Sequence, residues 1–136
     1  ADPAVYAFWV AVTKHSTELL DLLESTPITI EEWFRWRTIL REDCVASLVE
    51  KGFATLFMNR TNRSGILKAG VIGGKSQNGN YKLDARFKKD VVASRIREIA
   101  RRQSDISVYC EDSLRLLNRC SDFLPKQSLI YLDPPY

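Results

Sequence analysis

A short apolar run followed by two prolines, close to the end of the chain, restricts the possible folds more than any other feature. Residues 128–132 (Ser-Leu-Ile-Tyr-Leu) have the character of a buried strand. Asp133, Pro134, Pro135 and Tyr136 follow directly. The prolines fix two backbone angles and provide no N–H donors, which ends the strand. A carboxylate, unpaired carbonyls and an aromatic ring at the carboxyl end of a buried strand predict an α/β protein with a ligand site at that edge.

A second strand and a helix precede this run and complete a βαβ unit. Residues 106–110 have strand character, and a helix is expected to follow from Ser113. Because strands joined by a helix are normally parallel, Asp112 and Asp133 are expected at the same edge of the sheet. Two carboxylates there suit one polar cofactor and one polar substrate. Strands also end in Asp-Pro or Pro-Pro turns that have no chemical role. The choice between a ligand site and such a turn therefore depends on the rest of the chain.

The first 58 residues and a later segment have the periodicity of amphipathic helices. The first helix either continues past Ser16 or gives way there to a second one. Trp33 and Trp36 fit core packing better than stacking on bases, because they lie three residues apart on one helix. Helices are expected from Pro3 to the break at Ser25-Thr26-Pro27, from the capping box of Thr29 and Glu32 through Leu40, from Asp43 to Met58, and from Phe87 to Gln103.

A polar, basic and glycine-rich segment lies between these helices. Five of the six glycines fall between Gly65 and Gly79, and Asn78-Gly79 is a strong signal for a tight turn. Basic side chains suit phosphates and amides suit base edges, which favours nucleic-acid contact over an ordinary solvated loop. The candidate DNA-binding residues are Arg60, Asn62, Arg63, Lys68, Lys75, Gln77, Asn78 and Lys82.

The composition argues against several classes of protein. The chain has 136 residues, 45% hydrophobic and 27% charged, which suits one globular domain or part of a larger one. No apolar run approaches the ~20 residues of a membrane span, and no signal-peptide pattern occurs. Three widely spaced cysteines without a CxxC pair indicate buried reduced thiols in a cytoplasmic protein. His15 is the single histidine, so neither a serine-type triad nor a metal site is expected.

The ordered set of motifs resembles the Dam-like class of DNA adenine methyltransferases, which transfer a methyl group from S-adenosylmethionine to the exocyclic amine of adenine. The resemblance covers most of the chain. It implies part of a Rossmann-like, S-adenosylmethionine-dependent methyltransferase fold with a mainly helical target-recognition insertion. The motifs that carry it are Asp133 to Tyr136 after an apolar strand, Asp112 after the strand 106–110, Phe57-Met58-Asn59-Arg60 leading into Ser64-Gly65, and the opening Ala1-Asp2-Pro3-Ala4.

The resemblance implies a role for each residue of the closing motif. Asp133 and the carbonyl of Pro134 would accept hydrogen bonds from the target adenine amine, and Pro135 would stiffen the turn. Tyr136 would stack on the base after it has been flipped out of duplex DNA. Two acceptors favour a pyramidal nitrogen whose lone pair attacks the methyl group directly, so no catalytic cysteine or histidine is needed.

The resemblance also implies a cofactor site, although part of the family pattern is absent. Asp112 and Ser113 would lie beside the adenine ring of S-adenosylmethionine, with Asp2 near the ribose-binding position. The family's glycine-rich cofactor motif does not occur in the sequence. The chain is therefore expected to be an internal fragment that is inactive alone. Its expected parts are a helical piece of the catalytic core (1–28), a target-recognition region (29–103) with a basic loop or hairpin at 60–82, and a βαβ piece of the core (104–136).

Two other functions remain open from the sequence. One is a non-catalytic DNA-binding module that consists of helices and a basic glycine-rich arm. The other is a methyltransferase that acts on RNA or on protein amide groups, because the closing tetrapeptide suits any planar amine. The sequence does not indicate the DNA target site, a restriction partner or the oligomeric state.

Overall fold

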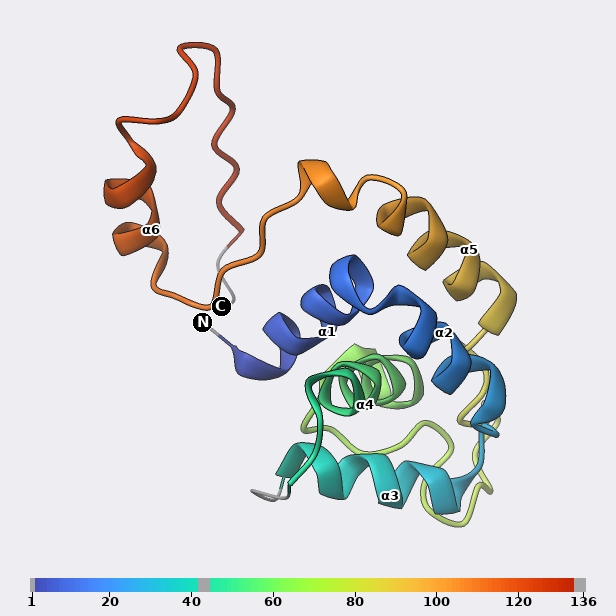
Figure 1. Ribbon diagram of the computed structural model, residues 1–136. Helices are drawn as coiled ribbons and strands as arrows, with labels where there is room; N and C mark the ends of the chain where they lie inside the picture. Colours follow the sequence, from blue (N-terminus) through green and yellow to red (C-terminus); the bar gives the residue numbers. More distant parts are fainter. Residues whose placement is uncertain (1, 42–44, 134–136) are drawn as a thin grey trace.

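The computed structural model describes residues 2–41 and 45–133, and these residues form helices and loops only (Figure 1). An isolated antiparallel bridge between Asn62 and Val71 is the one β-type pairing in these ranges. The helices in chain order are α1 (Pro3–Lys14), α2 (Ser16–Ser25), α3 (Ile30–Arg41), α4 (Leu48–Thr61), the 3-10 helix η1 (Arg63–Gly65), α5 (Lys89–Ala100), the 3-10 helix η2 (Gln103–Asp105) and α6 (Ser113–Cys120).

The predicted α/β, Rossmann-like fold is wrong for this part of the chain. Residues 106–110 and 128–132 are not in strands, so the predicted βαβ unit does not form and Asp112 and Asp133 share no sheet edge. Parallel strands need neighbouring strands and helices over both faces to bury their side chains. The described chain supplies none of these, and Leu129 is 93% exposed. Only the helix expected after Asp112 is found, as α6.

The start of the bundle follows the sequence signals closely. The Asp2 carboxylate caps α1, since its Oδ1 accepts a hydrogen bond from the Ala4 N–H at 2.9 Å, and Pro3 occupies the first turn. The alternative left open at Ser16 is resolved as two helices that meet at His15. The Thr29 hydroxyl accepts a hydrogen bond from the Glu32 N–H at 3.3 Å at the start of α3.

Helix α4 begins later than expected. It starts at Leu48 rather than at Asp43, which lies outside the described residues together with Cys44. A full capping box determines this start: the Ser47 hydroxyl accepts from the Glu50 N–H at 3.1 Å, and the Glu50 carboxylate accepts from the Ser47 N–H at 2.8 Å. The helix then continues to Thr61.

Helix α4 forms the centre of the hydrophobic core. Figure 1 views it along its axis, with α1 and α2 on one side and α3 on the other. Phe53 and Phe57 are fully buried, and Phe53 packs edge-on against Trp36 with ring centroids 4.7 Å apart. Trp33 and Trp36 are each 1% exposed, which confirms core packing rather than base stacking for both. Helices α1 and α2, which precede residue 28, therefore share one hydrophobic core with α3, α4 and α5, which follow it. Residue 28 is the expected boundary between the catalytic core and the target-recognition region.

Gly52 allows α1 and α4 to approach closely. A Cβ atom at this position would lie 2.8 Å from the Ala7 carbonyl oxygen and 2.9 Å from the Ala11 Cβ. Real Cβ atoms do not approach other atoms so closely, so a side chain here would push the helices apart. Glycine is a poor helix former, but the close crossing of α1 and α4 requires a residue without a side chain at this position.

For membrane spans, metal sites and thiols, the sequence can be compared with the structure only over the described residues. No helix there is long and apolar enough to cross a membrane. The same residues contain no group of three or more potential metal ligands. Cys110 and Cys120 are free thiols, but Cys110 is exposed and Cys120 is half-buried, so the prediction of buried thiols is wrong for both.

Candidate nucleic-acid interface

A buried hydrogen-bond network attaches the loop after α4 to helix α3. The Trp33 indole Nε1 donates to the Asn62 Oδ1 at 2.7 Å, and both side chains are almost completely buried. The Asn62 Nδ2 donates to the carbonyls of Ile66 at 3.0 Å and Leu67 at 2.9 Å. Asn62 therefore positions the loop and is not available to read a base edge from this location.

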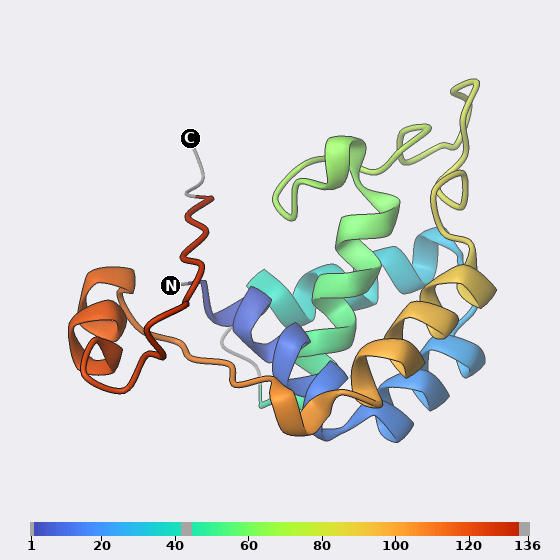
Figure 2. The ribbon, with the colours of Figure 1, turned by 90° about the horizontal axis from the view of Figure 1, so that it is seen from above.

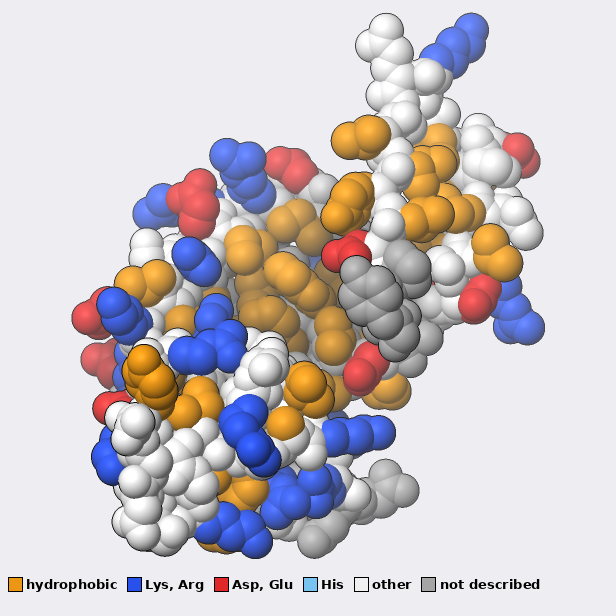
Figure 3. Space-filling model, turned by 180° about the vertical axis from the view of Figure 1, so that it is seen from behind, with side chains coloured by type: hydrophobic (Ala, Val, Ile, Leu, Met, Phe, Trp, Pro, Cys, Tyr) orange, Lys and Arg blue, Asp and Glu red, His pale blue; other side chains and the backbone are white. Residues whose placement is uncertain are grey.

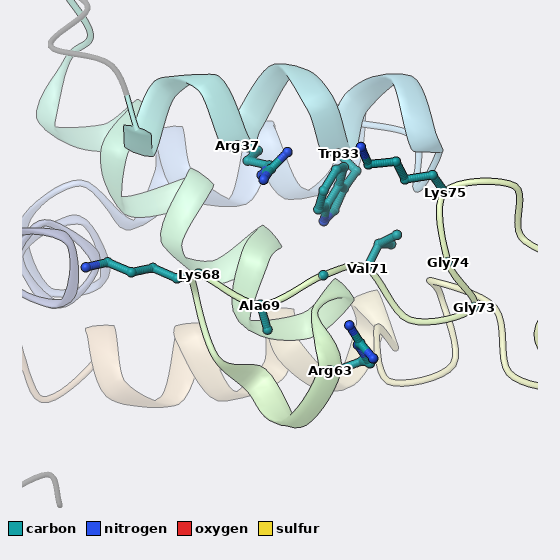
Figure 4. A pocket seen from close by; sticks show the side chains of 10 residues that line it. Trp33, Arg37, Arg63, Lys68, Ala69, Val71, Gly73, Gly74 and Lys75 are labelled. Carbon is teal, nitrogen blue, oxygen red and sulfur yellow. The ribbon is translucent and has the colours of Figure 1, made fainter.

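This loop and α3 enclose a cationic groove of about 490 Å³, which we call the basic groove (Figure 4). Its cations come from two places in the sequence, with Arg37 on α3 and Arg63, Lys68 and Lys75 on the segment after α4. No carboxylate lines it. The residues around it are Trp33, Arg37, Arg63, Lys68, Ala69, Gly70, Val71, Gly73, Gly74 and Lys75.

Two of the four cations of the basic groove contact aromatic rings. The Arg37 guanidinium lies 4.9 Å from the centre of the Trp33 ring, and the Lys75 Nζ lies 5.7 Å from the centre of the Phe34 ring. None of the four cations forms a salt bridge with a carboxylate of the described chain. The Arg37 Nε is also buried without a hydrogen-bond partner. The groove thus presents unneutralised charge and an unused donor, as an anion-binding surface does.

A second pocket of about 550 Å³ continues the basic groove and shares Arg37 and Lys68 with it. It adds Arg41, whose Nη2 donates to the Lys68 carbonyl at 3.3 Å. Asp2 is the acidic residue in its lining. The cationic surface therefore extends along α3 by about one further turn, from Arg37 to Arg41.

The glycine-rich segment after the groove is a loop held together by Gln77, not a hairpin. The Gln77 Nε2 donates to the Ile72 carbonyl at 2.8 Å and the Gly74 carbonyl at 2.6 Å, and its Oε1 accepts from the Leu83 N–H at 2.9 Å. Lys82 donates through its Nζ to the Gln77 carbonyl. The side chains of Gln77 and Lys82 therefore act within the loop.

The predicted DNA-binding residues separate into distinct groups. Arg63, Lys68 and Lys75 are brought together in the basic groove. Asn62 is buried, and Gln77 and Lys82 fasten the loop, while Asn78 is exposed on it. Arg60 lines a different pocket beside α1.

Sequence reasoning missed the contribution of α3 to this surface. Trp33, Arg37 and Arg41 are spaced by four residues, which places them on one face of a helix. That spacing is visible in the sequence and could have identified Arg37 and Arg41 as members of the cationic surface. It could not have shown that this face lies against the loop, because the loop is held there by the contact of Trp33 with Asn62.

The candidate catalytic residues do not form a site in the described part of the chain. Asp133 is exposed, and Pro134, Pro135 and Tyr136 lie outside the described residues. Residues 106–133 form an arm (Figure 2). Its first residues, 106–109, line a pocket with α1, and the rest of the arm projects from the bundle. The predicted adenine-binding motif is therefore known here only from its sequence and from the position of Asp133.

The candidate cofactor residues act as helix caps. The Asp112 Oδ1 accepts hydrogen bonds from the N–H groups of Leu114 at 3.0 Å and Arg115 at 3.2 Å, and Ser113 is the first residue of α6. Asp2 caps α1 in the same way. Since α6 has no buried residue, Asp112 and Ser113 lie on an open surface that does not enclose an adenosyl group. These residues, as placed, do not fit S-adenosylmethionine.

Comparisons with known proteins give no match to this chain. No family model, no curated protein and no solved structure is significantly similar to it. The function has to be argued from the residues, their geometry and the motifs in the sequence.

Proposed function

We propose that this chain belongs to a DNA adenine methyltransferase and that its helical bundle is the part that contacts duplex DNA. The observation that carries the proposal is the basic groove, whose lining has four cations and no carboxylate. One of these cations, Arg37, has a buried Nε without a hydrogen-bond partner. The ordered motifs that resemble the Dam-like class support the same conclusion. The cytoplasm, where DNA of this kind would be methylated, is the proposed location.

Phosphates of the duplex backbone are the proposed ligands of the basic groove. Each phosphate neutralised by a Lys or Arg releases condensed counterions, so binding depends steeply on salt. If the four cations of the groove each neutralise one phosphate, the logarithm of the binding constant falls with the logarithm of salt concentration with a slope of about −3.6. Base readout would come from groups near the groove, of which Asn78 is exposed.

Binding of a labelled duplex by the 136-residue chain at several salt concentrations tests this part of the proposal. The Arg63→Gln/Lys68→Gln variant is expected to reduce the magnitude of the slope by about 2. Arg35→Gln is the matched control on α3, because Arg35 pairs with Glu32 at 3.4 Å and does not line the groove. Equal slopes for the wild type and the groove variant would refute the assignment.

Methyl transfer is the proposed chemistry of the closing motif, with S-adenosylmethionine as the proposed donor. Asp133 and the Pro134 carbonyl would hold the adenine amine, and Tyr136 would stack on the flipped base. In a protein that carries this sequence together with a glycine-rich cofactor motif, Asp133→Ala is expected to abolish transfer of a labelled methyl group while duplex binding remains. The chain alone is expected to show little or no transfer.

A non-catalytic DNA-binding module is the second candidate function. The observation that favours it is that Asp133 is exposed on the arm and does not line the basic groove. Both candidates predict salt-sensitive duplex binding, but only the first predicts methyl transfer in the longer protein. Competition among duplex DNA, structured RNA and protein substrates in the same assay separates both from an enzyme that acts on RNA or on protein amide groups.

A further inference from the structure

We propose that Gly70 is a positioning residue for Arg63. Its lack of a side chain leaves room for the Arg63 guanidinium to lie on the loop backbone, so this cation of the basic groove is held in place before an anion binds. In identifying the anion as a phosphate of bound DNA, the inference rests on the proposed function. Both residues line the basic groove.

The Arg63 guanidinium lies directly against Gly70. A Cβ atom at Gly70 would be 3.1 Å from the Arg63 Nη2 and 3.8 Å from both the Cζ and the Nε of the same side chain. These three atoms are the nearest to it, and 3.1 Å is shorter than nearly all contacts of real Cβ atoms. A side chain at Gly70 would therefore move the guanidinium from its place in the basic groove.

Backbone conformation does not account for a glycine at this position. Gly73 and Gly74, further along the same loop, have φ angles of 80° and 75°, in the left-handed region that favours glycine. Gly70 is outside that region, so alanine could adopt its backbone angles. A side chain at Gly70 lacks only space, and the Arg63 guanidinium occupies that space.

The loop backbone that supports the guanidinium is itself fixed. The Arg63 N–H donates to the Gly70 carbonyl at 3.0 Å, which joins the two ends of the segment between them. The Ile72 N–H donates to the Thr61 carbonyl at 2.9 Å and extends this pairing. The buried Asn62 side chain holds the middle of the loop through two carbonyls. The guanidinium thus lies on a support that the fold determines.

This support matters because the Arg63 guanidinium has no polar partner in the described chain. Arg63 is exposed, and its side chain forms no salt bridge or hydrogen bond with a described residue. A freely moving arginine side chain loses rotamer entropy when an anion holds it. A guanidinium that already lies on the loop loses less, so Gly70 raises the affinity without adding a contact to the ligand.

The first experiment measures duplex binding by Gly70→Ala and Gly70→Val in the full 136-residue chain, with thermal unfolding as the check that each variant folds. Gly70→Ala should weaken binding. Gly70→Val should weaken it further and reduce the magnitude of the salt slope by about 1, as the loss of one phosphate contact would.

The matched control repeats both substitutions in the Arg63→Gln background. There they should have no further effect on binding, because the guanidinium that Gly70 supports is absent. Equal weakening in both backgrounds would mean that the new side chain obstructs the groove itself, and would overturn the positioning role. Unchanged binding by Gly70→Ala and Gly70→Val would also overturn it.

The second experiment separates this inference from the proposed function. Nuclear magnetic resonance follows the Arg63 Nε–H group while inorganic phosphate, and separately duplex DNA, is added. Gly70→Ala is expected to shift this resonance before any ligand is present and to weaken its response to phosphate. If phosphate binds in this Gly70-dependent way but no duplex binds, the positioning role stands and the proposed function fails. If the wild type and the Gly70 variants bind duplex equally, the role is refuted and the proposed function stands. If the wild type binds neither ligand, both are overturned.

Discussion

The bundle of α1 to α5 and the arm of residues 106–133 have similar apolar side chains but use them differently. In the bundle, Phe53 and Phe57 are fully buried around α4. In the arm, Phe123 is 84% exposed and Tyr131 is 80% exposed, and α6 buries no residue at all. Figure 3 shows apolar side chains open to solvent on the arm, and on the bundle it shows an apolar patch together with most of the Lys and Arg side chains of this face. Hydrophobic residues stabilise a fold only where other elements cover them, and only the bundle supplies such elements.

The largest expected difference between the bundle and the arm is in the loss of unfolding free energy when a phenylalanine of each is replaced by alanine. Phe53→Ala should lower the free energy of unfolding by about 3–5 kcal/mol, because it leaves a cavity beside Trp36. Phe123→Ala, in the arm, should change it by less than about 0.5 kcal/mol. Urea denaturation followed by circular dichroism measures both. Equal losses would show that the arm packs on the bundle in solution.

The contact of α1 with α4 provides the second test. Gly52→Ala should destabilise the bundle by about 1–3 kcal/mol, since the new Cβ would meet the Ala7 carbonyl and Ala11. Helix propensity alone predicts the opposite sign, a gain of about 1 kcal/mol. Thermal and urea unfolding decide between them. A stabilised variant would mean that the two helices separate easily.

Substitutions of two helix caps compare the bundle with the arm again, and smaller changes in the free energy of unfolding are expected. Ser47→Ala removes the cap of α4 and should lower the free energy of unfolding by about 1 kcal/mol. Asp112→Ala removes the cap of α6 and should leave global unfolding unchanged, because α6 has no buried residue to couple it to the core. Hydrogen exchange of individual amides distinguishes the outcomes, with faster exchange in α6 alone for the Asp112 variant. A global loss in that variant would contradict the independence of the arm.

The smallest expected effect concerns pH. Hydrogen bonds with the backbone and side chain of Ser47 lower the pKa of Glu50 from its ordinary value of 4.5. The charged carboxylate therefore stabilises the folded state above pH 4.5, and this stabilisation is lost as the pH falls through the lower folded pKa. Because Glu50 is partly exposed, the contribution is roughly 0.5 kcal/mol or less. Wild type and Glu50→Gln should differ in unfolding free energy at pH 7 and converge in acid; a constant difference would exclude this linkage.

The helices could be predicted from the sequence because their signals are local. Pro3, Thr29 and the apolar periodicity around Trp33 and Trp36 mark positions that form the observed helices. The start of α4 has an equally local signal, because the capping box of Ser47 and Glu50 specifies a helix that begins at Leu48 rather than at Asp43.

The strands could not be predicted reliably, because a strand depends on partners that its own residues do not specify. Residues 106–110 and 128–132 have suitable side chains, but none of the described chain pairs with them as a strand. The candidate site shows the same limit. The cations of the loop were visible in the sequence, whereas the burial of Asn62 and the approach of Arg37 depend on tertiary contacts with α3.

The location of Trp33 has an optical consequence. Its indole ring is fixed by the hydrogen bond to Asn62, lies beneath the Arg37 guanidinium and lines the basic groove. Trp36 packs on Phe53 and also has a guanidinium over its ring, that of Arg35 at 5.0 Å, while Trp9 is 40% exposed on α1. Neither of these two indoles lines the basic groove. A change of charge or solvation above the groove would alter the emission of Trp33 first. The protein thus contains an intrinsic fluorophore that reports occupancy of the groove without any added label.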